Sequence, residues 1–230
     1  MATSTSAFGL PNGRLLLGDS EASYSVYRSA AASLATSDEL AAAPDTMTWL
    51  DLRTPQEQAA DSGPGLPPSW VVERVNAHPS GDLALTEQNA IVQQFINGTV
   101  SFGQFYVALL ERSSAELARA VSVVVRANGP VLLTCQVGRD RTGVLSALLL
   151  LAVGATRDEV IADYLRTNDA LLVLAERLPE MPKEFDLTCL ATDIELALDY
   201  IEHRGGAQSY LIASGLPPED LHLLLTRFSR

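Results

Sequence analysis

Cysteine and histidine are both scarce in this sequence, and their scarcity excludes several classes of site. The two cysteines, Cys135 and Cys189, are too few for the disulfide framework of a small secreted domain. The three histidines show none of the spacing of a metal-binding motif, and they are His78, His203 and His222. We therefore expect a protein that needs neither a metal nor another cofactor.

Basic residues and long apolar runs are also few. The chain has 16 lysines and arginines against 28 aspartates and glutamates, which gives a net charge of −12 at pH 7. This balance argues against binding of nucleic-acid polymers and against stable association with anionic membranes. The longest apolar run, residues 144–154, is too short to span a bilayer and predicts a buried helix. Any anion site must therefore be a local concentration of positive charge in an acidic protein.

The start of the sequence, MATSTSAFGL, lacks the basic segment and the apolar stretch of a signal peptide. Together with the small number of cysteines, this favours a soluble protein of a reducing cytoplasm. The sequence leaves the oligomeric state open.

Length and composition favour a single globular domain over residues 1–230, with 47% hydrophobic and 19% charged residues. Short apolar runs predict strands at residues 14–18, 47–53, 70–77 and 131–134. Helical patterns cover residues 24–43, 86–110, 113–127, 142–153, 159–166, 169–178, 185–203 and 217–228. Strands and helices alternate early and helices accumulate late. We therefore predict an α/β fold with a central, mostly parallel sheet flanked by helices and with a helical C-terminal half.

The stretch TCQVGRDRTG, residues 134–143, joins the last predicted strand to an apolar helix. A glycine-containing loop at this place directs successive backbone N–H groups toward the positive end of the helix dipole, where tetrahedral oxyanions bind. Arg141 adds a planar fork that can hold two phosphate oxygens. Cys135 lies in the same field, and such surroundings lower the pKa of a thiol and make it nucleophilic. Thr142 can donate its hydroxyl to the sulfur.

Each of these residues also has an ordinary structural interpretation. A lone cysteine after an apolar strand is usually part of the core, and a run such as Arg-Asp-Arg is usually a solvated loop. The joint context decides between the two interpretations, because the strand, the glycines, the Thr-Gly pair and the apolar helix all occur in the required order. We therefore favour a cysteine nucleophile in an anion cradle.

This loop resembles the Cys-x5-Arg-Thr loop of the protein tyrosine phosphatase superfamily. More narrowly, it resembles the bacterial branch whose loop reads His-Cys-x-x-Gly-Lys-Asp-Arg-Thr-Gly and whose members act on phosphotyrosine and phosphoinositides. The resemblance extends over most of the chain, through the segments NGRLLLGDSE, WLDLRTPQEQ, VIADYLRTND and GAQSYLIASGLPPEDLHLL. Two departures lie in the loop itself, where Thr134 replaces the usual histidine and Arg139 replaces the usual lysine.

The resemblance implies a role for each loop residue. Cys135 would be the nucleophile, Arg141 would clamp the phosphate and Thr142 would assist the sulfur. The phosphate cradle would comprise Gln136, Val137, Gly138, Arg139, Arg141 and Thr142. No metal and no cofactor are implied.

Four further residues lie outside the cradle set or have alternative roles. Asp140 is the favoured general acid, and Asp82, which follows the strand at residues 70–77, is the alternative. Asp51 and Arg53 either form an ion pair that supports the loop or contact the substrate directly.

We therefore predict a cysteine-dependent phosphomonoester hydrolase that forms a phosphocysteine intermediate. Its expected substrate is a phosphorylated molecule, either a phosphotyrosine protein or a phosphoinositide. A phosphatase of a small soluble metabolite, such as a phosphorylated nucleoside or sugar, is the first alternative. A phosphate-binding module without turnover is the second, and a redox-sensing cysteine would be compatible with catalysis.

Overall fold

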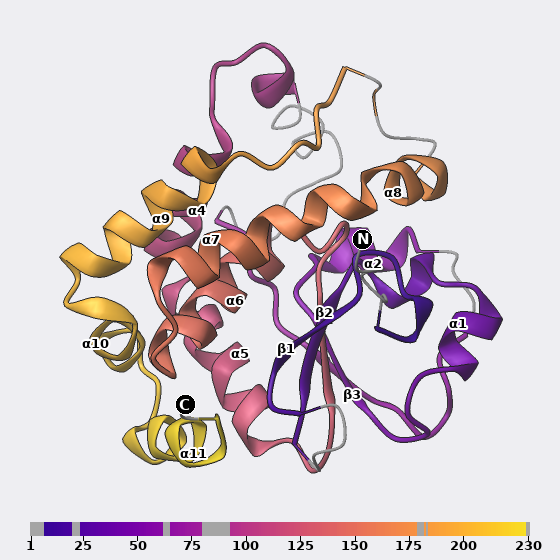
Figure 1. Cartoon of the computed structure of the whole chain (residues 1–230), viewed down its shortest axis with the longest axis horizontal. Coiled ribbons are helices and arrows are strands. Elements are labelled where there is room, and N and C mark those ends of the chain that lie inside the picture. Colours follow the sequence, from indigo (N-terminus) through magenta and orange to yellow (C-terminus); the bar gives the residue numbers. More distant parts are fainter. Residues whose placement is uncertain are drawn as a thin grey trace.

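A computed structural model describes residues 7–19, 24–61, 65–79, 93–178, 182 and 184–228. Its sheet has five strands in the order β1-β2-β5-β3-β4 (Figure 1). The strands are β1 (Arg14–Leu17), β2 (Val26–Ser29), β3 (Thr48–Asp51), β4 (Val71–Arg74) and β5 (Val131–Thr134). All neighbouring strands pair in parallel except β1, which runs antiparallel to β2 at one edge. The predicted α/β fold with a mostly parallel sheet is thus confirmed.

Strand β5 lies at the centre of the sheet, between β2 and β3. All four of its residues are buried, because both faces of the sheet are covered. Val131 and Leu133 point into the larger apolar cluster, and Leu132 points into a smaller cluster on the other face. This explains why the sequence here reads as a continuous apolar run.

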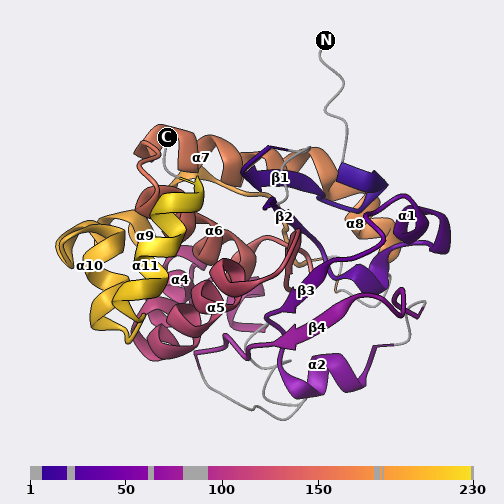
Figure 2. The same ribbon diagram turned by 90° about the horizontal axis from the view of Figure 1, so that it is seen from below.

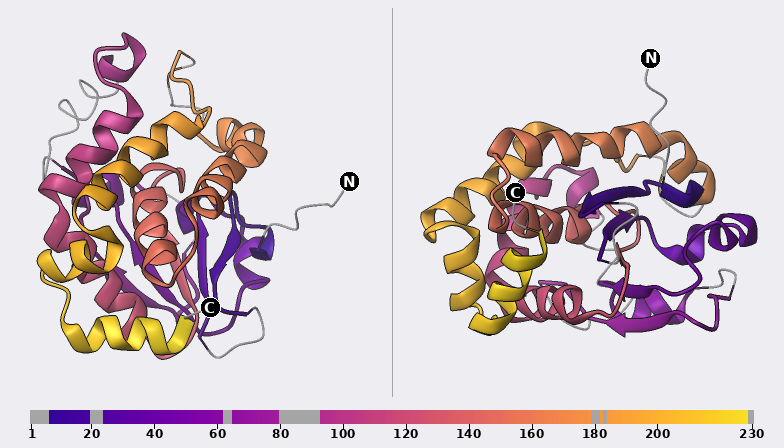
Figure 3. Two further views of the ribbon diagram at one scale, coloured as in Figure 1. Left: turned by 60° about the vertical axis from the view of Figure 1, so that its left-hand side comes forward. Right: turned by 60° about the horizontal axis from the view of Figure 1, so that its bottom comes forward.

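Most helices cover one face of the sheet, as Figure 2 shows for α4, α5, α6 and α9 to α11. The larger helices are α4 (Phe102–Arg112), α5 (Ser114–Arg126), α6 (Asp140–Ala152), α7 (Arg157–Leu165), α8 (Leu171–Arg177), α9 (Ala191–His203), α10 (Gly206–Ala213) and α11 (Pro218–Phe228). The short elements are α1 (Ser37–Ala41), α2 (Pro55–Ala59) and the 3₁₀ turns η1 (Ala7–Gly9), η2 (Ala32–Leu34) and η3 (Arg166–Ala170). Residues of η2 and α1 pack into the smaller cluster on the opposite face (Figure 3).

Helix α6 is the central helix of the larger layer and the one that carries the loop motif. It contacts α4, α5, α7, α9 and α10 as well as strands β1, β2 and β5. Eleven of its 13 residues are buried, so it needs no polar face. The buried helix predicted from the apolar run is confirmed, although it begins at Asp140, two residues before the predicted start.

The helix predicted at residues 24–43 is wrong. This segment contains β2, then η2, and only then the short helix α1. Every residue of β2 is buried and hydrogen-bonds into the sheet between β1 and β5. The alanines begin only after β2, and helix propensity is a weak preference that burial of Val26–Ser29 between two strands outweighs.

The helix predicted at residues 185–203 begins later, at Ala191. Helix α4, within the helix predicted at residues 86–110, begins only at Phe102. Helices α2 and α10 were not predicted. The remaining predicted helices and strands lie near their predicted positions where the structure describes them. None of the helices in the described ranges is long and apolar enough to cross a membrane.

Candidate active site

The loop between β5 and α6 has its carbonyl oxygens engaged by the N-terminal part of the chain. Ala31 N donates to the Gln136 carbonyl at 3.0 Å. Asn12 Nδ2 donates to the carbonyls of Val137 and Gly138, at 3.0 and 3.1 Å. In a trans peptide the N–H group points opposite to the preceding carbonyl. These contacts therefore turn the loop N–H groups toward the other side.

The N–H groups of residues 136–139 have no acceptor among the residues that the structure describes. Backbone amides in native proteins seldom lack a partner. These four lie at the amino end of α6, which has 13 residues and a full helix dipole. A row of unengaged N–H groups at such a place can bind an anion.

Gly138 allows the loop to approach strand β2. Its φ angle is +71°, and a Cβ atom there would lie 2.4 Å from the Ser29 carbonyl oxygen. No side chain fits at that distance, and the backbone conformation itself favours glycine. The glycine in the motif is therefore required by the close contact with the end of β2.

Four buried or partly buried residues on or near β1, β2 and α7 hold the loop in place. Arg28 Nη2 donates to the Gly138 carbonyl at 2.7 Å, and its Nη1 donates to Asp163 Oδ2 at 2.5 Å. Arg14 Nε donates to the other carboxylate oxygen of Asp163 at 2.7 Å, and Arg14 Nη1 donates to Asn12 Oδ1 at 2.5 Å. Burial raises the pKa of Asp163, but the two arginines outweigh it and lower that pKa. We call Asn12, Arg14, Arg28 and Asp163 the loop brace.

Arg141 is held by a carboxylate on α2. Its Nη1 and Nη2 donate to the two carboxylate oxygens of Glu57, each at 2.6 Å. Burial would raise the pKa of Glu57, but the Arg141 charge outweighs it and brings that pKa down to about 2. A guanidinium has five N–H donors, so Nε–H and one N–H on each terminal nitrogen remain for a ligand.

Cys135 is the first residue after β5 and is only 1% exposed. Burial would lower the pKa of Arg141, but the charge of Glu57 outweighs it and raises that pKa, with a smaller contribution from Cys135. Thr142 is fully buried, and its hydroxyl has no hydrogen-bond partner. The expected contact between this hydroxyl and the sulfur is therefore not formed in this structure.

Asp140 is oriented by two donors that share one of its oxygens. The Tyr106 hydroxyl donates to Asp140 Oδ1 at 2.7 Å, and Arg139 Nε donates to the same atom at 3.0 Å. The Tyr106 hydroxyl also lies 2.7 Å from that of Tyr164. Burial and the charge of Asp140 raise the pKa of Tyr106, so it stays protonated and can donate. Only Oδ1 accepts these bonds, so Oδ2 is left for other chemistry.

The side chain of Arg139 contacts aromatic rings. Its guanidinium lies 3.7 Å from the ring centroid of Phe102 and 5.8 Å from that of Phe185. Arg139 is only 1% exposed. The ordinary interpretation of Arg-Asp-Arg as a solvated loop is therefore wrong, because Arg141 is buried as well.

The neighbouring strand β3 supports the loop from the side. Thr134 accepts a hydrogen bond from Trp49 Nε1 at 2.7 Å. Arg53 Nη2 donates to Asp51 Oδ2 at 2.9 Å, and Arg53 Nη1 donates to Gln136 Oε1 at 3.4 Å. Asp51 and Arg53 are both buried. This geometry favours the interpretation of Asp51 and Arg53 as an ion pair that supports the loop.

Asp82, the alternative acid, lies outside the described residues. Among those that are described, no group of three or more histidine, cysteine, aspartate or glutamate side chains is placed to hold a metal ion.

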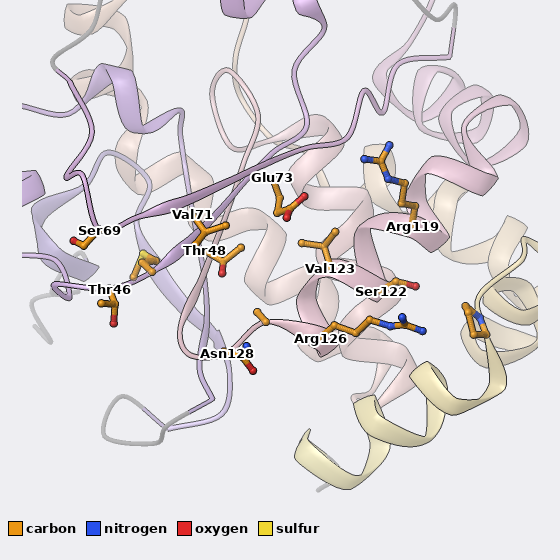
Figure 4. Close-up of a pocket in the computed structure, with 13 residues that line it drawn as sticks. Thr46, Thr48, Ser69, Val71, Glu73, Arg119, Ser122, Val123, Arg126 and Asn128 are labelled. Carbon is orange, nitrogen blue, oxygen red and sulfur yellow. The ribbon is translucent and has the colours of Figure 1, made fainter.

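A cavity of about 560 Å³ is lined by residues outside the loop (Figure 4). Its walls include Thr48 at the start of β3, Val71 at the start of β4 and Arg126 on α5. It therefore lies at the amino ends of β3 and β4, whereas the loop follows the carboxyl end of β5.

Sequence reasoning missed the loop brace, Glu57 and Tyr106. A signal was present for some of them, because Arg14, Glu57 and Asp163 lie in three of the segments that carry the resemblance. If residues from three distant segments hold the same loop, the resemblance to the family should extend to all three segments. Tyr106 lies in none of these segments, and nothing in its local sequence marks it.

The sequence model of the tyrosine phosphatase family matches residues 22–229 of the chain. The chain belongs to this family. The predicted resemblance to the tyrosine phosphatase superfamily is thus confirmed.

Two relatives within the tyrosine phosphatases align over part of the chain. A stretch of 84 residues is 43% identical to the triple specificity protein phosphatase PtpB of Mycobacterium tuberculosis, and covers 36% of this chain and 30% of that protein. A stretch of 102 residues is 28% identical to the tyrosine-protein phosphatase of Nostoc commune, and covers 44% and 32% respectively. The matched stretches thus span about a third of the length of either relative.

Among solved structures, the chain is similar to the core catalytic domain of the PP-IP phosphatase SIW14 from S. cerevisiae, in complex with citrate. The TM-score is 0.41 and the sequence identity 15%, over 88% of this chain and 95% of that chain.

Proposed function

We propose that this tyrosine phosphatase family member is a cysteine-dependent phosphomonoester hydrolase acting through a phosphocysteine intermediate. The observation that carries the proposal is the row of unengaged N–H groups at residues 136–139. Cys135 stands at one end of this row, and Arg141 stands at the other with three N–H donors to spare. A tetrahedral phosphate in the cradle would be held by donors on several sides while a nucleophile lies beneath it.

In the first step, the Cys135 thiolate attacks phosphorus in line with the leaving oxygen. An S–P bond forms as the P–O bond to the leaving group breaks. The loop N–H groups and Arg141 hold the three equatorial oxygens, where the transition-state charge is spread. In the second step, water attacks phosphorus, the S–P bond breaks, and inorganic phosphate and the thiolate are released. The Thr142 hydroxyl, which has no other partner, would donate to the sulfur as it leaves.

Asp140 is the proposed general acid. Tyr106 and Arg139 both donate to Oδ1, so the proton would reside on Oδ2 and pass from there to the leaving oxygen. In the second step the same carboxylate would take the proton of the attacking water. Asp82 remains the alternative acid.

The role of Asp140 can be tested with two substrates. Asp140→Asn should lower turnover of an alkyl phosphate by about 10²–10⁴-fold, and that of p-nitrophenyl phosphate far less, because nitrophenolate leaves without a proton. Asp82→Asn should leave both nearly unchanged. The reverse pattern would assign the acid to Asp82.

The proposed substrate is a phosphotyrosine residue of a protein. The names of both relatives describe them as protein phosphatases, one of them for tyrosine. We further propose that residues 1–230 act as one phosphatase domain in the cytoplasm.

The phosphocysteine mechanism is tested by replacing the nucleophile. Cys135→Ser should abolish release of phosphate from p-nitrophenyl phosphate and from a phosphotyrosine peptide, while inorganic phosphate still binds in a calorimetric titration. The cradle and Arg141 do not depend on sulfur, so binding should survive. Cys189→Ser is the matched control and should remain active, because that cysteine lies outside the loop. Turnover by Cys135→Ser would rule the mechanism out.

A further inference from the structure

A second cavity, of about 450 Å³, lies beside the loop, and four of its ten lining residues are arginines. Its walls come from α2, from the end of β4, and from the junction of α4 and α5. We call it the arginine pocket, after Arg53, Arg74, Arg112 and Arg119. The only carboxylate in its lining is that of Glu116.

Three of the four arginines carry unbalanced charge. Arg74, Arg112 and Arg119 form no ion pair with any carboxylate of the described residues. Eight other arginines do, namely Arg14, Arg28, Arg53, Arg126, Arg139, Arg141, Arg157 and Arg177. In a chain with a net charge of −12, three unpaired cations in one cavity form a local positive site.

A buried hydroxyl in the same wall also lacks a partner. Ser113 joins α4 to α5, lines the pocket and is only 1% exposed. Its Oγ has no hydrogen-bond partner. Buried hydroxyls are normally hydrogen-bonded, so an unpartnered one in a cationic cavity points to an acceptor supplied by a ligand.

The pocket adjoins the phosphate cradle. His78 lines it, and burial together with the charge of Arg141 lowers the pKa of that histidine to about 4, so His78 is neutral at pH 7. Arg53 also lines the pocket and donates to Gln136 of the loop at 3.4 Å. A substrate held in the cradle can therefore extend into the pocket.

We propose that the arginine pocket binds acidic side chains next to the phosphotyrosine of a protein substrate, and this rests on the proposed phosphatase function. The three unpaired guanidiniums come from β4, α4 and α5 and are exposed, so the positive charge is spread along a cavity. A compact polyphosphate needs cations that converge on one point, whereas an extended peptide presents carboxylates in a row. Each guanidinium can pair with a carboxylate through two parallel hydrogen bonds.

The test compares two phosphotyrosine peptides that differ only in flanking residues, Asp and Glu in one and Asn and Gln in the other. The wild-type protein should show a KM about tenfold lower for the acidic peptide, since each exposed ion pair contributes about two- to fivefold. The triple variant Arg74→Gln/Arg112→Gln/Arg119→Gln should lose this preference, with kcat and p-nitrophenyl phosphate turnover unchanged. Arg204→Gln, an exposed arginine outside the pocket, should keep it.

Equal KM values for the two peptides, or a preference that survives in the triple variant, would overturn the proposal. The proposal would also be overturned if the triple variant raised the KM for a soluble sugar bisphosphate more than it raised the KM for the acidic peptide. Failure of the phosphatase proposal would look different, because the wild type would then not hydrolyse p-nitrophenyl phosphate. In that case fluorescence anisotropy of the acidic peptide with an unphosphorylated tyrosine still tests the pocket. The triple variant should no longer bind this peptide. Equal binding to the wild type and to the triple variant would refute the proposed role of the pocket.

Discussion

The loop between β5 and α6 is held in different ways on its two sides. On the side of β1 and β2, the loop brace contacts backbone carbonyl oxygens, through Asn12 and Arg28. On the side of α2 and α4, other residues contact only side chains of the loop. Glu57 holds Arg141, and Tyr106 holds Asp140.

The difference separates two tasks that a catalytic loop must perform. Backbone contacts determine the shape of the cradle, and that shape is part of the fold. Side-chain contacts determine the directions of Arg141 and Asp140, the proposed clamp and acid, and these directions should affect the reaction more than stability. Substitutions on the two sides should therefore have different signatures in unfolding and in kinetics.

The largest expected effect is on the brace side. Arg28→Met leaves Asp163 with one fewer cation and the Gly138 carbonyl with one fewer donor. Removing one partner of a buried ion pair costs about 3–5 kcal/mol of unfolding free energy. Urea unfolding should show this loss, with activity falling in parallel.

The control for Arg28 is Arg157→Met, which removes a half-exposed pair with Asp199. It should cost at most about 1 kcal/mol. If Arg28→Met and Arg157→Met lower the unfolding free energy by the same small amount, the brace does not hold the loop.

On the other side, Glu57→Gln should change kinetics more than stability. The amide can accept only one of the two bonds from Arg141, so the guanidinium loses its fixed direction. We expect kcat to fall by about ten- to a hundredfold, because small displacements of a positioned group are costly. Inorganic phosphate should inhibit more strongly, because a negative charge beside the clamp has been removed.

Glu39 provides a matched control for Glu57. It forms the same kind of two-bond pair with Arg177, at 2.6 and 2.7 Å, and caps α1 as Glu57 caps α2. Glu39→Gln should leave kcat and phosphate inhibition unchanged. A Glu57→Gln protein with normal kcat would show that the pair with Arg141 is only structural.

Tyr106→Phe should have a smaller effect that depends on the leaving group. The change removes one of the two donors to Asp140 Oδ1 and leaves Arg139 as the other. Turnover of an alkyl phosphate should fall about tenfold, which corresponds to the loss of one hydrogen bond worth about 1.4 kcal/mol. Turnover of p-nitrophenyl phosphate should fall less, because its leaving group needs no proton. An equal loss for both substrates would mean that Tyr106 acts on stability alone.

The smallest effect concerns pH. Burial and the charge of Arg141 lower the pKa of His78 to about 4, whereas an unfolded chain protonates this residue near pH 6.5. The unfolded state thus binds more protons between these values, so the contribution of His78 is intact above pH 6.5 and declines toward pH 4. The decline should be about 1 kcal/mol, because solvent screens a half-buried ring.

This pH dependence can be isolated by difference. The unfolding free energy of the wild type minus that of His78→Asn should decrease by this amount between pH 7 and pH 4. A difference that stays constant over this range would mean that His78 titrates normally in the folded protein.

The sequence predicted the loop well because its signals are local. Cys135, Gly138 and Arg141 lie within seven consecutive residues between a strand and a helix, so their spacing alone indicates a cradle. Strand β5 was predicted with its observed bounds for the same reason.

The residues that hold the loop could not be predicted in this way. Arg14 and Asp163 are 149 positions apart, and Glu57 and Arg141 are 84 positions apart, so only the folded sheet brings them together. The local sequence indicates only that Glu57 forms a capping box with Thr54, and the structure shows that it also does this. Arg139 was predicted to belong to the cradle, and the contacts of its side chain with Phe102 and Phe185 could not be foreseen because these rings come from distant segments.

The hydrogen bond between Trp49 and Thr134 gives the protein an intrinsic optical reporter. The indole donates to the residue that directly precedes Cys135, and the Arg53 guanidinium lies 5.6 Å from its ring centroid. The chain contains only one other tryptophan, Trp70. In a Trp70→Phe background, the emission of Trp49 would follow occupation of the cradle in real time, without a label and without turnover.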